Sequence, residues 1–307
     1  MTFMRFSGLF LFLITILLCQ DHSLTAQNRY TPPDPYTIVE NKQHFSKYMI
    51  MNPAYLGPNG LPVPRLHMGS NPEKLNLEMS YEHYFQNQEK TQDVLIDIKI
   101  PVANGKVALE FRYVPFEFYE VKEEMSRRRR SRSGESLSGQ SFGDVYFGTA
   151  VQLIEGHSWM PDLLFGMSCK TASGTNLEDA RHTDSPGYYI DLSMGKSYPF
   201  GKELKNYFRW YMLGGFYAWQ TYIDEFPQND ALYYGFGMTL DFKSVYLASN
   251  LRGLSGYMFN GDQPVVLIGE IGLREGRTAF VLGYEWGIID YPFKCVRVGF
   301  KLDGMIE

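Results

Sequence analysis

The sequence predicts an all-β fold: a transmembrane antiparallel β-barrel of about 12 strands, preceded by an irregular Pro-rich N-terminal segment. From Leu75 onward, apolar residues recur at every second position, which is the period of a strand with one apolar face. Aromatic residues make up 16% of the 307 residues, yet the mean hydropathy is only -0.26. A membrane barrel combines these properties because lipid-facing and lumen-facing residues alternate along each strand.

Composition excludes several other classes of protein. The aromatic content is too high for a disordered chain, and 29 Gly with 16 Pro exclude a long coiled coil. A net charge of -5 gives no support for nucleic-acid binding. A soluble all-β sandwich is the alternative that composition leaves open.

The first 27 residues predict a signal peptide. Arg5 precedes a mostly apolar run over residues 6–18, which is too short for a spanning helix and suits a signal-peptide core. Cys19 raises the alternative of a lipid-anchored protein, although Leu18 stands where a small residue is expected. The predicted organisation is a signal peptide at 1–27, an irregular segment at 28–74 and a barrel at 75–307, located in the outer membrane.

The irregular segment is rich in proline, with seven Pro residues between positions 32 and 64. Proline lacks the backbone N–H that a strand ladder needs, so this segment is not predicted to join the sheet. We expect it to cover the mouth of the barrel or to plug its lumen.

Twelve strands are predicted, beginning near Leu75, Val94, Val107, Val145, Leu163, Tyr188, Tyr207, Leu232, Val245, Val265, Thr278 and Lys294. Asn104-Gly105 predicts a tight hairpin turn between two of them. The long links, near residues 119–141, 172–186 and 253–263, are separated by short ones. This alternation is typical of a barrel that has turns at one end and loops at the other.

One strand carries aromatic residues on a single face, namely Tyr207, Tyr211, Tyr217 and Trp219. A membrane barrel places aromatic girdles at both lipid interfaces. The sequence therefore predicts that these four side chains face lipid.

The opposite face of the predicted strands carries charges of both signs. The predicted lumen residues are Glu78, Asp97, Lys99, Glu110, Arg112, Asp144, Lys170, Asp191, Asp241, Glu270, Glu285, Arg297 and Lys301. Because buried charges must be paired or hydrated, we expect an interior that is cross-linked by ion pairs or narrowly wet. By this register Cys169 faces lipid and Cys295 faces the lumen, so the two should not pair.

Candidate chemistry is sparse. The His, Ser and Cys spacings of known catalytic and metal-binding motifs are missing, so neither enzyme activity nor a cofactor is predicted. The sharpest charge cluster consists of Arg127, Arg128, Arg129, Arg130 and Arg132, in the longest predicted loop. It could bind the phosphates of lipopolysaccharide or an acidic partner, because arginine pairs with phosphate through two hydrogen bonds. The alternative is a solvated loop.

Two short stretches carry a family resemblance. Phe45-Ser46-Lys47-Tyr48-Met49 and then Asn52-Pro53-Ala54-Tyr55-Leu56-Gly57 resemble the opening of the PorP/SprF family. The resemblance implies a Bacteroidota outer-membrane barrel associated with type IX secretion and gliding, with secretion machinery and an exported surface protein as partners. It makes Phe45, Tyr48, Asn52, Pro53, Ala54, Tyr55 and Gly57 candidates for docking a partner. A barrel that passes or binds a small solute, with the N-terminal segment as plug, is the alternative function.

Overall fold

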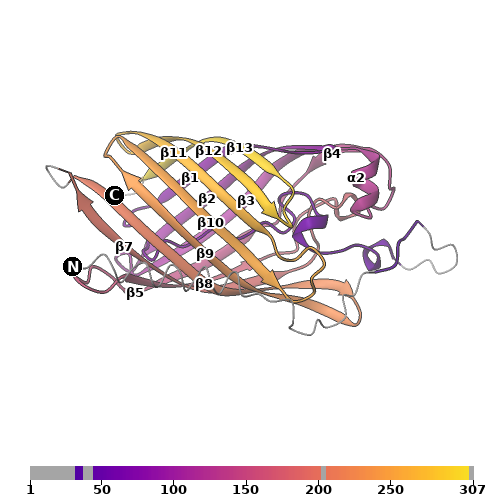
Figure 1. Ribbon diagram of the computed structural model, residues 1–307, viewed down its shortest axis with the longest axis horizontal. Coiled ribbons are helices and arrows are strands. Elements are labelled where there is room, and N and C mark those ends of the chain that lie inside the picture. Colours follow the sequence, from indigo (N-terminus) through magenta and orange to yellow (C-terminus); the bar gives the residue numbers. More distant parts are fainter. Residues whose placement is uncertain (1–31, 37–43, 202–204, 304–307) are drawn as a thin grey trace.

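The computed structural model describes residues 32–36, 44–201 and 205–303. The predicted signal peptide, Cys19 and the beginning of the Pro-rich segment lie outside the described residues. Thirteen strands form one antiparallel sheet that curves into a barrel (Figure 1). The strands are β1 (Asn76–Gln86), β2 (Glu89–Val102), β3 (Val107–Val121), β4 (Leu137–Ser141), β5 (Tyr146–Ile154), β6 (Asp162–Lys170), β7 (Gly187–Phe200), β8 (Asn206–Ile223), β9 (Phe226–Asp241), β10 (Val245–Gly256), β11 (Val265–Glu275), β12 (Thr278–Ile289) and β13 (Lys294–Asp303).

The helices within the described residues are short. They are η1 (Phe45–Lys47), η2 (Pro53–Tyr55), α2 (Glu123–Arg128) and η3 (Leu177–Asp179). None of the helices in the described ranges is long and apolar enough to cross a membrane.

The sheet closes on itself. Strand β1 pairs with β13 on one side and with β2 on the other, and β2 pairs in turn with β3. From β5 to β13 each strand pairs with the next one in chain order, and β5 pairs with β3, so the ladder returns to its starting point. Closure satisfies the backbone N–H and C=O groups that an open edge would leave unpaired, which the interior of a bilayer requires.

Strands β4 and β5 act as one strand of the barrel. Both pair with β3, and Val107, Arg112 and Glu117 lie opposite Val151, Tyr146 and Ser141 in one unbroken register. Between the two strands, the Gly143 N–H still donates to the Val114 carbonyl at 2.8 Å. The structure is therefore a 12-strand barrel with one interrupted strand, and the predicted fold class is confirmed.

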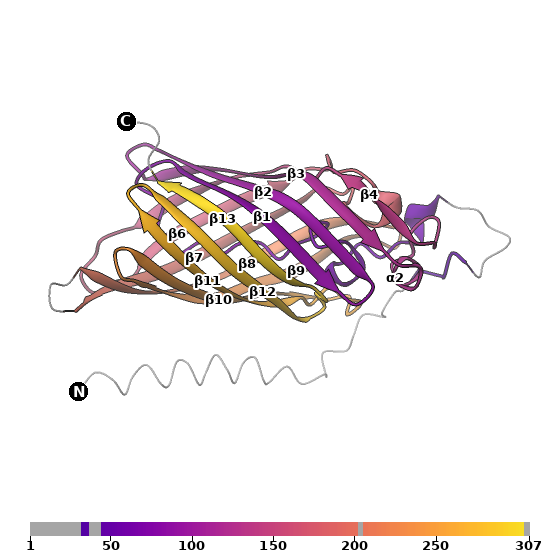
Figure 2. The ribbon, with the colours of Figure 1, turned by 90° about the horizontal axis from the view of Figure 1, so that it is seen from above.

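The links sort by length onto the two ends of the barrel. The loop end carries links 122–136, 171–186 and 257–264 together with three short links, whereas the turn end carries only links of a few residues. At the turn end, Asn104 and Gly105 adopt the positive φ values of a tight hairpin turn. The segregation predicted from link lengths is confirmed, and β1 begins and β13 ends at the turn end (Figure 2).

Alternation along the strands separates an apolar exterior from a polar interior. Phe111, Leu192 and Leu282 point outward and expose 38%, 44% and 53% of their surface. On the inner face, Asp191 beside Leu192 is only 3% exposed, and Glu110 beside Phe111 is half-buried. Cys169 lies on the outer face and Cys295 on the inner one, and both thiols are free, as predicted.

The prediction for the aromatic residues of β8 is wrong. Tyr211, Tyr217 and Trp219 are only 3%, 1% and 1% exposed, because they point into the barrel. Tyr207 lies on the same face and lines a cavity inside the lumen. Strand β8 is apolar on both faces, so its sequence pattern cannot distinguish the lipid-facing side from the lumen-facing side. The inner aromatic side chains pack against a segment of the chain that lies inside the barrel.

A charge placed on the outer surface should destabilise the barrel according to its depth. Leu192→Arg, in the middle of β7, is expected to lower the free energy of unfolding by about 2–4 kcal/mol, because the cation must sit in hydrocarbon. The matched variant Leu273→Arg, near the turn end of β11, should cost only about 0–1 kcal/mol. Urea unfolding in liposomes measures both, and equal costs would contradict a lipid-facing exterior.

Candidate functional site

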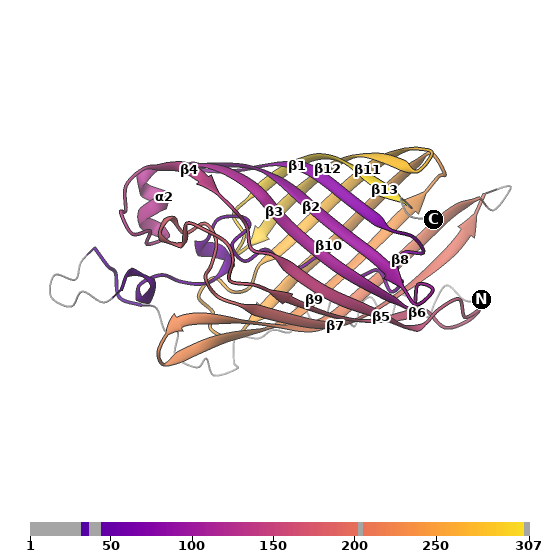
Figure 3. The same ribbon diagram turned by 180° about the vertical axis from the view of Figure 1, so that it is seen from behind.

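Residues 44–75, here called the plug, run through the lumen from the loop end to the turn end. At the loop end, the Ala54 N–H donates to the Gly261 carbonyl at 3.2 Å. Midway, the Tyr233 hydroxyl donates to the Arg65 carbonyl at 2.9 Å. At the turn end, the Asn71 side chain donates to the Gly105 carbonyl at 3.0 Å. The indigo chain therefore enters the barrel at the end that carries α2 and leaves it where β1 begins (Figure 3).

The residues that resemble the PorP/SprF opening hold the plug at the loop end. Asn52 is 2% exposed; its amide donates to the Asn260 carbonyl at 3.3 Å and accepts from the Asn229 amide at 3.0 Å. Pro53 is buried at the first position of η2, where the fixed φ of proline suits a helical turn. Tyr55 lies against Gly261 in the link between β10 and β11.

The rest of this stretch contacts other loops of the same barrel. The Gly57 N–H donates to the Ala180 carbonyl at 2.7 Å. A Cβ at Gly57 would lie 2.6 Å from Cζ of Arg181, so any side chain at this position would displace the guanidinium. The Tyr48 carbonyl accepts from Arg130 at 3.1 Å, and the guanidinium of Arg132 lies 5.8 Å from the centre of the Phe45 ring. These candidate docking residues thus bind the loops of their own barrel.

The half of the lumen nearest the loop end is filled with apolar side chains. From the plug, Met49, Met51, Leu56, Leu61 and Val63 are each at most 3% exposed. They form one core with inward-facing residues of the strands, among them Tyr217, Trp219, Tyr233, Leu254, Tyr291 and Phe293. The Trp219 ring N–H donates to the Met51 carbonyl at 2.7 Å. This core closes the barrel at the loop end.

A buried ion cluster, here called the latch, fastens two long loops over the plug. It consists of Glu89 on β2, Glu117 on β3, Arg129 after α2 and Arg181 after η3, all at most 3% exposed. Glu89 pairs with both arginines. Arg181 also donates to Glu117 at 2.9 Å, and its guanidinium lies 4.6 Å from the centre of the Tyr119 ring.

The plug joins the latch through a hydrogen bond. The Asn59 amide donates to Asp93 at 2.6 Å and to Glu117 at 2.8 Å. Burial disfavours the charge of Arg181, but the carboxylates of Glu117 and Glu89 outweigh it and hold the pKa of the guanidinium above its ordinary value. Arg181 therefore stays charged, and the latch connects strands, loops and plug.

The arginine run of the longest loop is largely engaged within the chain. Arg129 belongs to the latch, Arg130 donates to the carbonyls of Pro32 and Tyr48, and Arg132 covers Phe45. Arg127 pairs with Glu123 at 3.0 Å and also lies over the Tyr36 ring. Arg127, Arg128 and Arg132 are exposed, so these three retain access to solvent.

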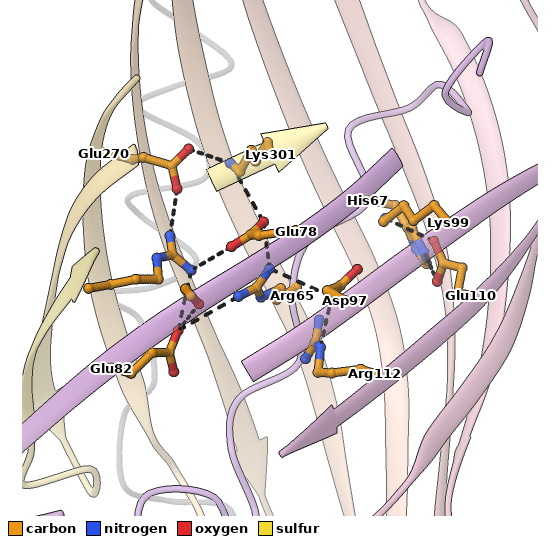
Figure 4. A network of polar contacts seen from close by, with 12 residues as sticks. Arg65, His67, Glu78, Glu82, Asp97, Lys99, Glu110, Arg112, Glu270 and Lys301 are labelled. Carbon is orange, nitrogen blue, oxygen red and sulfur yellow. Dashed lines mark hydrogen bonds and ion pairs between the residues drawn. The ribbon is translucent and has the colours of Figure 1, made fainter. Parts of the chain in front are cut away.

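The half of the lumen nearest the turn end is polar and is crossed by ion pairs (Figure 4). Arg65 of the plug donates to Glu78 at 3.0 Å and lies 3.6 Å from Asp97. Asp97 also accepts from Arg112 at 3.0 Å, and Lys99 pairs with Glu110 at 2.9 Å. The network continues through Glu82, Glu270, Arg297 and Lys301.

His67 of the plug bridges two strands. Its Nδ1 lies 2.8 Å from Asp191 on β7, and its Nε2 lies 3.0 Å from Glu110 on β3. Both ring nitrogens face carboxylates, so both must donate, and the ring is an imidazolium. Plug residues thus supply cations at the centre of the network.

The predicted lumen charges all lie on the inner face, and most belong to this network or adjoin it. The two exceptions are Lys170 and Asp144, which pair with each other at 2.7 Å near the loop end. Sequence reasoning missed Arg65 and His67, because the plug has no period that assigns its side chains to a face. Their polarity in a Pro-rich stretch between apolar residues was the only available signal.

A cavity of about 590 Å³ occupies the turn-end half of the lumen. It is lined by plug residues including His67 and Asn71, and by strand residues including Tyr207, Asp241 and Arg274. Among the residues described by the structure, no group of three or more His, Cys, Asp or Glu is placed to hold a metal ion. The arrangement offers charged surfaces for binding.

Comparison with known proteins identifies no family for this chain. No family model and no curated protein matches the chain. Among solved structures, it is similar to an outer membrane channel from Pseudomonas putida F1, with 10% identity and a TM-score of 0.49 over 78% of this chain and 97% of that one. The KdgM porin shows 10% identity and a TM-score of 0.46 over 74% of this chain and 98% of that one. The NanC porin shows 8% identity and a TM-score of 0.46 over 74% of this chain and 99% of that one. At this low identity, and with TM-scores below 0.5, these similarities say nothing of what the chain binds.

Proposed function

We propose that this protein is a closed, non-catalytic outer-membrane barrel that serves as a membrane-embedded scaffold for exported surface proteins. The observation that carries the proposal is the plug, which fills the loop-end half of the lumen with an apolar core. The buried latch adds ion pairs between the loops and the strands that surround that core. An interior held in this way suits a structural component better than a pore for solutes.

The resemblance of residues 45–49 and 52–57 to the PorP/SprF opening supports a role in type IX secretion. These residues hold the plug against the loops at the loop end, which faces the cell exterior in bacterial barrels. A scaffold for exported proteins needs a rigid set of external loops, and the plug supplies that rigidity. We infer that the loop end is where an exported surface protein or the secretion machinery is engaged.

Two measurements test the proposal. The full-length protein in planar bilayers is expected to be electrically silent, because the core at the loop end leaves no continuous water path. In cells that lack the gene, one or more exported proteins should disappear from the surface, and the wild-type gene should restore them. Stable conductance steps together with an unchanged surface proteome would overturn the proposal.

Stable conductance with an unchanged surface proteome would support the other candidate function, a plugged channel. The turn-end cavity of about 590 Å³ favours it, since a solute-sized space already exists in half of the lumen. Such a channel would require the plug to leave, so the wild-type protein itself would conduct, whereas the scaffold would conduct only when the latch is broken.

A further inference from the structure

We propose that the turn-end cavity binds a small soluble polyanion, with two or more phosphate or carboxylate groups, which enters from the periplasmic side. This inference goes beyond the scaffold function, since a barrel closed at the loop end can still bind a ligand from the turn end. It rests on the distribution of charge in the cavity wall, on one buried arginine and on the volume of the cavity.

The wall of the cavity is cationic although the network around it is nearly balanced. Seven Lys or Arg side chains and His67 line it, against five carboxylates. The basic residues are Arg65, Lys99, Arg209, Arg252, Arg274, Arg297 and Lys301, and the acidic ones are Glu78, Asp97, Glu110, Asp241 and Glu270.

Several acidic partners lie behind the wall. Arg209 pairs with Asp162, Arg252 with Glu285 and His67 with Asp191, and none of these three carboxylates lines the cavity. These carboxylates hold the three cations in place at the wall of the cavity. Preorganised cations in a partly enclosed, low-dielectric space attract anions more strongly than the same cations on a surface.

The second, independent observation concerns the environment of Arg252. It is 8% exposed, it lines the cavity, and its Nε has no hydrogen-bond partner among the described residues. Its acidic partner is Glu285, which accepts from Nη2 at 3.2 Å. A buried guanidinium N–H without an acceptor is costly. Nε is closed off from the cavity in this structure, so an oxygen of a bound anion would satisfy it only after the side chain turns toward the open space.

The size of the cavity limits the ligand. A volume of about 590 Å³ is typical of a site for a small molecule. The cations that line it are spread over plug and strands, from Arg252 inside to Arg274 at the turn end, so an anion with separated charged groups can contact several at once. The geometry points to a compact polyanion and not to a polymer.

Titration of the purified full-length protein with inorganic pyrophosphate tests the site. Isothermal calorimetry in an uncharged detergent, at constant ionic strength, is expected to show saturable binding with one site per chain. Arg252→Gln and Arg274→Gln should each weaken binding by about ten-fold, the usual loss when one charge-assisted hydrogen bond is removed. Arg277→Gln is the matched control, because Arg277 is exposed in the adjoining turn and does not line the cavity.

A variant that binds pyrophosphate more tightly cannot be explained by misfolding, unlike one that binds it more weakly. Asp241 lines the cavity and pairs with Arg274 at 2.9 Å, so Asp241→Asn frees a cation and should tighten pyrophosphate binding several-fold. If Arg252→Gln fails the test of heat-modifiable gel mobility, Lys301→Gln replaces it. Absence of saturable binding, equal weakening by Arg277→Gln, or unchanged affinity of Asp241→Asn would each overturn the proposal.

Discussion

An Arg181→Met protein is expected to lose about 3–5 kcal/mol of unfolding free energy, the cost of removing one partner from a buried ion pair. Arg181 is fully buried and donates to Glu89, Glu117 and Thr91. Without it, Glu117 keeps the neutral donors Asn59 and Ser141, and His182 at 3.6 Å, so part of the desolvation of that carboxylate goes uncompensated. Urea unfolding in detergent, followed by tryptophan fluorescence, measures the loss, since Trp219 packs directly on the plug.

The same substitution should loosen the plug. Arg181 lies against Gly57 and belongs to the loop whose Ala180 carbonyl binds the Gly57 N–H. When this loop is released, the loop end loses one of its attachments to the plug. We therefore expect intermittent conductance in planar bilayers, where the wild type is silent.

Arg127→Met is the matched control for this prediction. Arg127 is exposed and pairs with Glu123 four residues earlier, an arrangement that contributes less than about 0.5 kcal/mol. A double variant, Arg181→Met with Glu117→Gln, should recover part of the lost stability by removing the orphaned charge. If Arg181→Met and Arg127→Met unfolded at the same urea concentration, the latch would not stabilise the fold.

The barrel could be predicted from the sequence because the bilayer imposes a period of two on every strand. Leu192 and Asp191 differ so sharply in polarity that their faces are unambiguous, and the same holds for most strands. The lengths of the links then distinguished the loop end of the barrel from the turn end. These patterns arise from the backbone and the solvent, so they are visible without knowledge of tertiary contacts.

The site could be predicted only in part, because the plug obeys no period. The sequence identified Asp97, Glu110 and Arg297 as lumen charges, but not Arg65 and His67, which connect them. The aromatic residues of β8 were misassigned for a different reason. A lumen that holds its own apolar core removes the polarity difference on which alternation depends.

The arginine run shows a further limit of local reasoning. A cluster of arginines in a polar loop has the same sequence signature whether it binds an external anion or the chain itself. Arg129 is 2% exposed because Glu89 lies beneath it, and nothing near position 129 announces a partner 40 residues away. Long-range pairing of this kind becomes visible only in the fold.

The direction in which the plug threads the barrel leads to the last prediction. Residues 32–36 precede the plug and lie at the loop end, where Arg130 binds the Pro32 carbonyl and the Tyr36 hydroxyl donates to the Ser131 carbonyl. Bacterial barrels place their longer loops outside the cell and their turns in the periplasm. A cysteine at Asp34 should therefore be accessible from outside the cell.

The measurement is labelling of whole cells with a membrane-impermeant maleimide. In a background where Cys169 and Cys295 are changed to Ala, Asp34→Cys is expected to react in intact cells. Arg277→Cys, exposed in the turn between β11 and β12, should react only after the outer membrane is permeabilised. The two positions differ in their end of the barrel and not in exposure, so the comparison isolates orientation.

The outcome also constrains how the protein assembles. Labelling of Asp34→Cys from outside means that the segment before the plug lies beyond the membrane while β1 begins at the periplasmic end. Because the plug crosses the lumen and the strand ladder encloses it, the sheet must then close around a segment already in place, or the segment must cross a barrel that is still open. Labelling of Arg277→Cys in intact cells, with Asp34→Cys protected, would reverse the orientation and place the latch in the periplasm.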